Sequence, residues 1–86
     1  MKQNKTRRVK QTVLVSVDGE GLEITPFYNG DMQASLRINM DKGFRISAHG
    51  NWAYPWRITN HSGAEIWLTV ESMNALLAKL GTYFDS

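Results

Sequence analysis

The chain of 86 residues contains no cysteine and only two histidines. The lack of cysteine excludes disulfide bonds, zinc sites with thiolate ligands and catalysis by a cysteine nucleophile. It fits a reducing compartment, so we expect a cytoplasmic protein. No run reaches the ~18 apolar residues of a membrane span, and no apolar segment follows the basic start as in a signal peptide. We therefore expect no membrane partner.

Few side chains are placed to carry catalysis or to bind a metal. His61 falls in a predicted turn, and His49 shares a strand face with Ser47. Side chains two positions apart on one strand stand about 6–7 Å apart, which is too far for the hydrogen bond that activates a nucleophile. No group of acids and histidines has a metal-ligand spacing. The sequence predicts a protein that is not an enzyme and holds no cofactor or metal.

The basic residues are concentrated at the start of the chain. Residues 1–10 hold five of the ten Lys and Arg and none of the eight Asp and Glu. We expect a flexible basic arm over residues 1–10, followed by one folded domain over residues 11–86. Two interpretations of the arm stay open: a solubilising terminus, or a contact with nucleic acid.

The first predicted hairpin follows residues 12–17, where valines alternate with other residues in the period of a strand. The pair Asp18-Gly19 is typical of a type I′ turn, in which both central residues have positive φ. A two-residue loop there would pair Val15 with Leu22 and keep apolar residues on one face.

The second predicted hairpin starts from the clearest alternation in the chain, over residues 32–40. Pro26 and the letters YNGD are expected to end the strand before it, because proline cannot donate to a ladder. A three-residue turn with Gly43 in the left-handed conformation would pair Ile38 with Ile46.

The third predicted hairpin turns at the letters HSG, residues 61–63. A three-residue loop pairs Ile58 with Ile66 and Trp56 with Leu68, whereas a longer loop would oppose Ile58 to an acid. We therefore expect Trp56 to fill the core.

A helix is predicted to close the chain. Thr69 is a suitable N-cap, and Gly81 a suitable residue just past the C-terminus. The apolar face has helical spacing and consists of Met73, Leu76, Leu77 and Leu80. Tyr83 and Phe84 are expected to pack beneath the helix end. The fold class is α+β: an antiparallel sheet of five or six strands, made of three consecutive hairpins, with one C-terminal helix on one face.

The sheet face opposite the helix is the candidate binding surface. Arginine and tryptophan are enriched in interface hot spots, and they also suit single-stranded nucleic acid. Arg57 is expected directly opposite Trp67, where a cation–π contact can form. The candidate binding residues are Arg37, Arg45, Arg57, Trp67 and His49 on this face, and Lys5, Arg7 and Arg8 in the arm.

The letters AEIWLTVESMNALLAKLG lead from a last strand into a C-terminal helix, and this order resembles the single-stranded DNA-binding domains of the positive cofactor four family. The chain departs from that pattern at Ala64-Glu65, where the family is basic, and in an additional N-terminal hairpin. Two functions remain open. One is a non-enzymatic module that binds single-stranded nucleic acid. The alternative is a protein-binding adaptor or inhibitor, of the kind that phages and mobile elements encode, whose partner can be a second copy of the chain.

Overall fold

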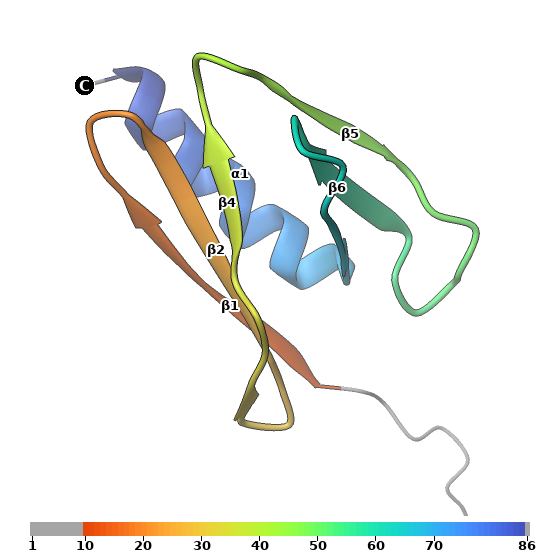
Figure 1. Ribbon diagram of the computed structural model, residues 1–86. Coiled ribbons are helices and arrows are strands. Elements are labelled where there is room, and N and C mark those ends of the chain that lie inside the picture. The colour runs from red at the N-terminus through yellow and green to blue at the C-terminus, as the bar shows by residue number, and fades with distance from the viewer. Residues whose placement is uncertain (1–9, 86) are drawn as a thin grey trace, which may run out of the picture.

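The computed structural model describes residues 10–85, with side chains to Thr82, and shows two antiparallel sheets and one C-terminal helix (Figure 1). The strands are β1 (Gln11–Val17), β2 (Gly21–Tyr28), β3 (Asp31–Met32), β4 (Leu36–Asn39), β5 (Phe44–Ala48), β6 (Trp56–Asn60) and β7 (Glu65–Leu68), and the helix is α1 (Val70–Asp85). Strands β1 to β4 form a four-stranded sheet, and β5 to β7 form a three-stranded sheet. The α+β class is confirmed, whereas the single sheet of five or six strands is wrong.

The first hairpin forms, but its register differs from the prediction. Val17 pairs with Leu22 and Val15 with Ile24, whereas the expected pair was Val15 with Leu22. The shift is an even number of residues, so the same apolar side chains still face the core. Alternation therefore predicted the face correctly and the register wrongly.

The loop of this hairpin is held by an aspartate side chain and not by a left-handed turn. Asp18 Oδ1 accepts hydrogen bonds from the backbone N–H groups of Glu20 and Gly21, at 2.8 and 3.0 Å. Gly19 is not among the residues with positive φ, so the predicted type I′ turn is wrong. An aspartate that caps nearby N–H groups is a common alternative way to close a turn.

The left-handed turn lies instead at Asn29-Gly30, with φ values of 53° and 89°. It joins β2 to the short strand β3. Pro26 was expected to end the strand, but β2 continues through it. Strand β2 pairs with β3 from Phe27 onward and with β4 up to Ile24, so Pro26 lies between the two ladders, where only its carbonyl takes part in a hydrogen bond, from the backbone N–H of Gln33 at 2.9 Å. Its missing N–H is therefore not needed there.

The second predicted hairpin does not form. Ile38 on β4 pairs with Leu22 on β2, and Ile46 on β5 pairs with Ile58 on β6. The expected pair of Ile38 with Ile46 is therefore wrong. Gly43 does have the predicted positive φ, at 82°, but its turn leads the chain from one sheet to the other. Each strand has found an equally apolar partner elsewhere, which the alternation alone does not identify.

The third hairpin is confirmed, with Ile58 opposite Ile66 and Trp56 opposite Leu68. Gly63 closes the loop with a φ of 91°. Trp56 is on the core side of the sheet, but 37% of its surface is exposed. Its predicted role as a core filler is wrong, because it lies at the end of β6, beyond the fully buried Ile58.

The helix begins as predicted, since Thr69 Oγ1 accepts a hydrogen bond from the backbone N–H of Ser72 at 3.1 Å. Leu77 is 47% exposed, so its predicted place on the buried face is wrong. Gly81 is not a terminal residue, because α1 continues to Asp85. The expected packing of Tyr83 and Phe84 concerns side chains outside the described ones.

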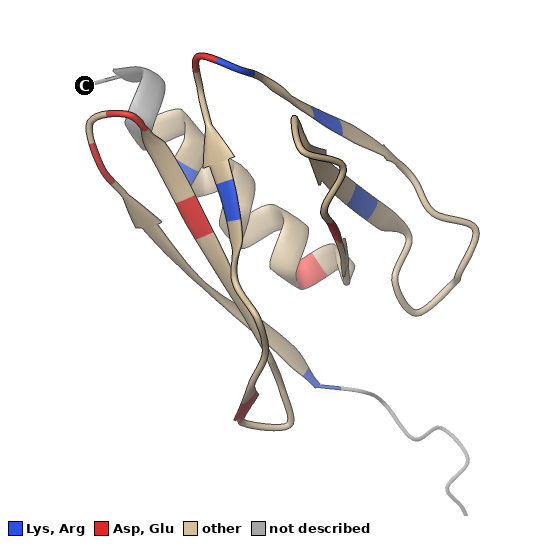
Figure 2. Ribbon diagram, viewed as in Figure 1, with Lys and Arg blue, Asp and Glu red and all other residues tan. Residues whose placement is uncertain are grey.

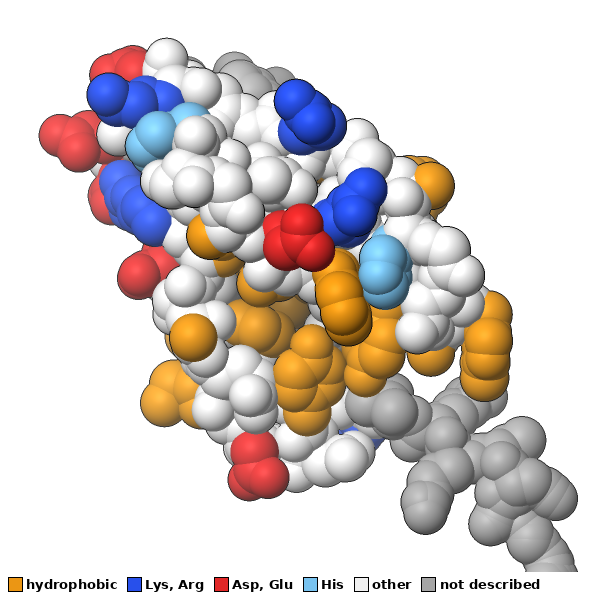
Figure 3. All heavy atoms as spheres, turned by 45° about the vertical axis from the view of Figure 1, so that its right-hand side comes forward, with side chains coloured by type: hydrophobic (Ala, Val, Ile, Leu, Met, Phe, Trp, Pro, Cys, Tyr) orange, Lys and Arg blue, Asp and Glu red, His pale blue; other side chains and the backbone are white. Residues whose placement is uncertain are grey.

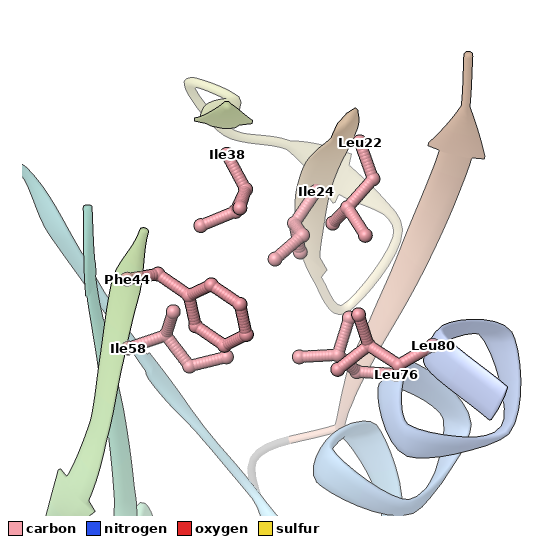
Figure 4. Close-up of a pocket in the computed structure, with 7 residues that line it drawn as sticks. All are labelled: Leu22, Ile24, Ile38, Phe44, Ile58, Leu76 and Leu80. Carbon is pink, nitrogen blue, oxygen red and sulfur yellow. The ribbon is translucent and has the colours of Figure 1, made fainter. Parts of the chain in front are cut away.

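The core lies where the two sheets and the helix meet (Figure 4). The close-up shows side chains from all three elements pointing toward one another, with no space for a water molecule between them. They are Leu22, Ile24 and Ile38 from the four-stranded sheet, Phe44 and Ile58 from the three-stranded sheet, and Leu76 and Leu80 from α1.

Two polar side chains tie the sheets together at their edges. The buried Gln11 on β1 donates from Nε2 to the carbonyl of Trp67 at 2.9 Å and accepts from the N–H of Thr69 at 2.8 Å. On the other side, Asn60 Nδ2 donates to the carbonyl of Arg37 at 2.9 Å. These bonds fix the three-stranded sheet, and hence its outer face, relative to the rest of the protein.

Candidate functional site

The outer face of the three-stranded sheet carries two rows of polar and aromatic side chains. Strand pairing aligns Arg45 with Thr59 and Glu65 in one row, and Ser47 with Arg57 and Trp67 in the next. Side chains alternate across a strand, so these two rows point away from the core. Figure 2 shows the basic bands on β5 and β6 that belong to this face.

Trp67 stacks on an imidazole ring. The predicted pairing of Arg57 opposite Trp67 is confirmed by the strand register. The indole, however, lies on the ring of His49, with a centroid distance of 4.3 Å and an interplanar angle of 22°. Arg57 directs its Nε toward Ser47 Oγ instead, at 3.1 Å. The ring partner of Trp67 is therefore a histidine that reaches across the intervening strand.

His49 is held in place by the loop that follows β5. Its backbone N–H donates to the carbonyl of Pro55 at 2.7 Å, which extends the β5–β6 pairing beyond the end of the strand. Its Nδ1 lies 3.0 Å from the carbonyl oxygen of Tyr54. A carbonyl oxygen can only accept, so this hydrogen bond requires that Nδ1 carries a hydrogen.

The indole of Trp67 is also fixed at its edge. Its Nε1–H donates to Glu65 Oε2 at 3.0 Å, while 43% of the side-chain surface remains exposed. Two neighbours thus orient an accessible aromatic ring. Trp52, by contrast, is 90% exposed, and no hydrogen bond or ring contact of its indole is found among the described residues.

An open groove of about 350 Å³ runs between the two sheets beside Trp67. Figure 3 shows hydrophobic side chains gathered on this side of the molecule, next to a histidine, an acidic and a basic side chain. The groove is lined by Pro26, Tyr28, Gln33 and Ala34 from the four-stranded sheet and its loop, and by Glu65, Ile66 and Trp67 from β7.

Near the groove, Tyr28 on β2 contacts Tyr54 from the loop between β5 and β6. Their rings meet edge to face, with a centroid distance of 6.0 Å and an interplanar angle of 89°. Burial raises the pKa of the Tyr54 hydroxyl, and the neighbouring Tyr28 adds to the rise. Tyr28 OH also accepts a hydrogen bond from Gln11 Nε2 at 3.3 Å. The same buried glutamine therefore supports both a wall of the groove and the strand that carries Trp67.

Arg37 lies outside this face. It was expected beside Arg45 and Arg57, but β4 belongs to the four-stranded sheet. Its guanidinium forms two hydrogen bonds with the carboxylate of Asp18, at 2.7 and 3.0 Å. The hydrogen bond from Arg37, followed by that from the Glu20 N–H, holds the pKa of Asp18 well below its usual range. The charge of Arg37 is thus already balanced by that of Asp18.

A second open hollow, of about 550 Å³, lies at the end of the three-stranded sheet where two turns meet. Three of its lining side chains are basic or can become so: Lys42, Arg45 and His61. Arg45 thus connects this hollow to the row that contains Glu65. The candidate residues Lys5, Arg7 and Arg8 lie outside the described part of the chain.

No group of three or more potential metal ligands is found among residues 10–85. Within the same part of the chain, no helix has the length and apolar character needed to cross a membrane.

Sequence reasoning missed the contribution of Tyr28 and Gln33, which come from the other sheet. No local pattern could have revealed them, since their place depends on how the two sheets meet. Comparison with known proteins finds no family model, no curated protein and no solved structure that matches the chain. The resemblance drawn from the last strand and helix thus gains no support, and the functional argument rests on geometry.

Proposed function

We propose that the protein is a small non-enzymatic module that binds single-stranded nucleic acid on the outer face of β5, β6 and β7. The observation that carries this proposal is the stacked pair of His49 and Trp67, an oriented aromatic ring that remains exposed on the face that also carries Arg57. Bases of any sequence stack on such a ring, and guanidinium groups bind the phosphates that connect them.

Arg45 and Arg57 supply the cations. Neither forms an ion pair with a described side chain, in contrast to Arg37. They occupy diagonal positions on paired strands, a geometry that places residues about 7–8 Å apart. Two guanidinium groups at this spacing can bind neighbouring phosphates of one strand. The basic residues Lys5, Arg7 and Arg8 of the N-terminal arm would add phosphate contacts that are independent of sequence.

The test of the aromatic platform compares two tryptophan variants. Fluorescence anisotropy of a labelled oligo-dT strand should show that Trp67→Ala weakens binding by roughly 5- to 150-fold, because one stacked base contributes about 1–3 kcal/mol. Trp52→Ala is the matched control, since its ring is more exposed but does not belong to the outer face of β5, β6 and β7. Equal losses in both variants would show that exposed indoles bind the strand without the proposed face.

The test of the cations uses salt. Each phosphate contact contributes about −0.7 to the slope of log K against log salt for a single strand. Arg45→Gln and Arg57→Gln should each weaken binding and make this slope shallower, whereas Arg37→Gln should change neither. Binding that is insensitive to salt, or absent at low salt, contradicts the proposal. The change in this slope when residues 1–9 are removed measures how much the arm contributes to the phosphate contacts.

A protein partner is the second candidate, and a different surface favours it. Leu14 and Met32 are both more than half exposed on the four-stranded sheet. They lie on the face that points away from the core, on either side of the half-buried Phe27. Light scattering after size exclusion tests whether this face pairs two copies of the chain. A dimer that Leu14→Asp converts to monomer supports the pairing, and a monomer at high concentration excludes it.

A further inference from the structure

We infer that the groove between the two sheets accepts one base of the bound strand and selects guanine, with Glu65 as the residue that determines specificity. This inference rests on the proposed function and deepens it. The proposed function requires only stacking and phosphate contacts, whereas the groove adds a hydrogen-bonding edge that distinguishes one base from another.

The walls of the groove suit a flat ring. Trp67 belongs both to the outer face and to the groove, so a strand stacked on its indole runs directly past the opening. Tyr28 and Pro26 form the opposing wall from the four-stranded sheet. Aromatic and apolar side chains of this kind hold unstacked bases in single-stranded recognition. The volume of about 350 Å³ is ample for one base.

Two side chains of the groove, Glu65 and Gln33, have oxygens that can accept a hydrogen bond from a ligand. Glu65 uses Oε2 to hold the indole N–H of Trp67, which leaves its Oε1 without a partner among the described residues. Gln33 uses one Nε2–H to donate to the carbonyl of Asp31 at 3.0 Å, which leaves its Oε1 and its second N–H without a partner among the described residues. A carboxylate can only accept, so a ligand that binds Glu65 must donate hydrogen bonds, and Gln33 Oε1 can accept a further one.

Guanine is the base that meets this requirement best. Its Watson–Crick edge presents N1–H and N2–H₂ side by side, two adjacent donors that match the two oxygens of a carboxylate or neighbouring acceptors. Thymine offers one donor between two carbonyl oxygens, which a carboxylate repels. Adenine and cytosine each offer one amino group beside a ring acceptor.

The same argument explains why an acid stands on a surface proposed to bind an anionic strand. Glu65 weakens the attraction for every strand through its charge, and only a base with two donors compensates for that effect. Specificity that arises by penalising the wrong ligands is a common property of binding sites with a fixed polar group.

The experiment measures anisotropy with four labelled oligo-dT strands that differ at one central position, which carries dG, dA, dC or dT. A single guanine avoids the self-association of guanine-rich strands. We expect the native protein to bind the dG strand about tenfold more tightly than the other three, as for a bidentate base contact. Glu65→Gln, whose amide oxygen can still accept from the indole N–H of Trp67, should reduce this preference to less than about twofold.

Glu23→Gln is the matched control, because Glu23 is an exposed acid on the four-stranded sheet and should leave the preference intact. Gln33→Leu removes the second acceptor and should also lower the preference. Equal binding of all four strands by the native protein overturns this inference but leaves the proposed function standing. An equal gain for all four strands in Glu65→Gln shows that Glu65 acts by charge alone and overturns it as well. Failure to bind any strand overturns both proposals.

Discussion

Gly21 is the residue at which the four-stranded sheet leaves no space for a side chain. A Cβ added there would overlap the carbonyl oxygen of Ile38 on the neighbouring strand, and a backbone atom cannot move aside as a flexible side chain can. We expect Gly21→Ala to lower the free energy of unfolding by about 1–3 kcal/mol, the usual effect of overpacking. Urea denaturation gives the value.

Gly19→Ala serves as the control for this substitution, because nothing lies within 4 Å of its added Cβ and its φ is not positive. It should change stability by less than about 0.5 kcal/mol. If the two alanine variants were equally stable, the close approach of β2 and β4 at Gly21 would be contradicted.

Asp18 is the residue whose charge depends most on its neighbours. Hydrogen bonds from Arg37 and from the backbone N–H of Glu20 depress its pKa in the folded protein. The unfolded chain therefore takes up the proton more readily. The stabilisation is present above the ordinary aspartate pKa of about 3.9 and is lost as the pH falls toward the folded value.

We expect Arg37→Gln to raise the pKa of Asp18 toward its ordinary value, as measured by NMR titration of the side-chain carboxyl. The acid side of the stability curve should become less steep, although only modestly, because both side chains are exposed to solvent. Arg45→Gln should leave this titration unchanged. A pKa of Asp18 that stays depressed in Arg37→Gln would show that the backbone hydrogen bonds alone are sufficient.

At the level of elements, the effect of Gly81→Ala on stability depends on where the helix ends. The sequence suggests that Gly81 follows the helix end, where positive φ would make alanine unfavourable. In the structure, α1 continues to Asp85, and an added Cβ at Gly81 meets nothing. We therefore expect Gly81→Ala to stabilise the protein by about 0.5–1 kcal/mol in thermal or urea unfolding. A loss of stability would place the helix end at Gly81.

The strands show which features of this fold can be read from the sequence. Alternation predicts the buried face of most strands, since the period of two is a local property, although Met32 on β3 is exposed. It gives the register of the hairpin that pairs Ile58 with Ile66, but not that of the first hairpin, where Val15 pairs with Ile24. It does not predict the partner when several strands have equally apolar faces. Ile38 therefore pairs with Leu22 and not with the expected Ile46.

The contacts of the candidate site also divide into those that local sequence patterns predict and those that they do not. Arg57 opposite Trp67 follows from a single hairpin, so the sequence predicts it. The stack of His49 on Trp67 spans three strands and depends on an irregular loop, which no spacing rule describes. The position of Arg37 required knowledge of which sheet β4 joins. Contacts that cross between hairpins or sheets are thus the part that local patterns leave undetermined.

At the level of the whole molecule, the two sheets are separate ladders that side chains connect. Gln11 takes the place of a ladder partner between β1 and β7, because its amide both donates to and accepts from the backbone. Asn60 provides the corresponding link between β6 and β4. A groove between the sheets can therefore exist while the surrounding backbone groups remain satisfied.

Gln11→Ala tests whether this connection holds the sheets in place. It leaves the carbonyl of Trp67 and the N–H of Thr69 without their partner in a partly buried position, so we expect a loss of about 1 kcal/mol or more in the free energy of unfolding. Hydrogen exchange should also become faster at the Thr69 amide. Gln33→Ala is the control, because this exposed glutamine connects no strands of different sheets. If Thr69 stayed protected in Gln11→Ala, the packing of α1 and the core alone would be sufficient to join the two sheets.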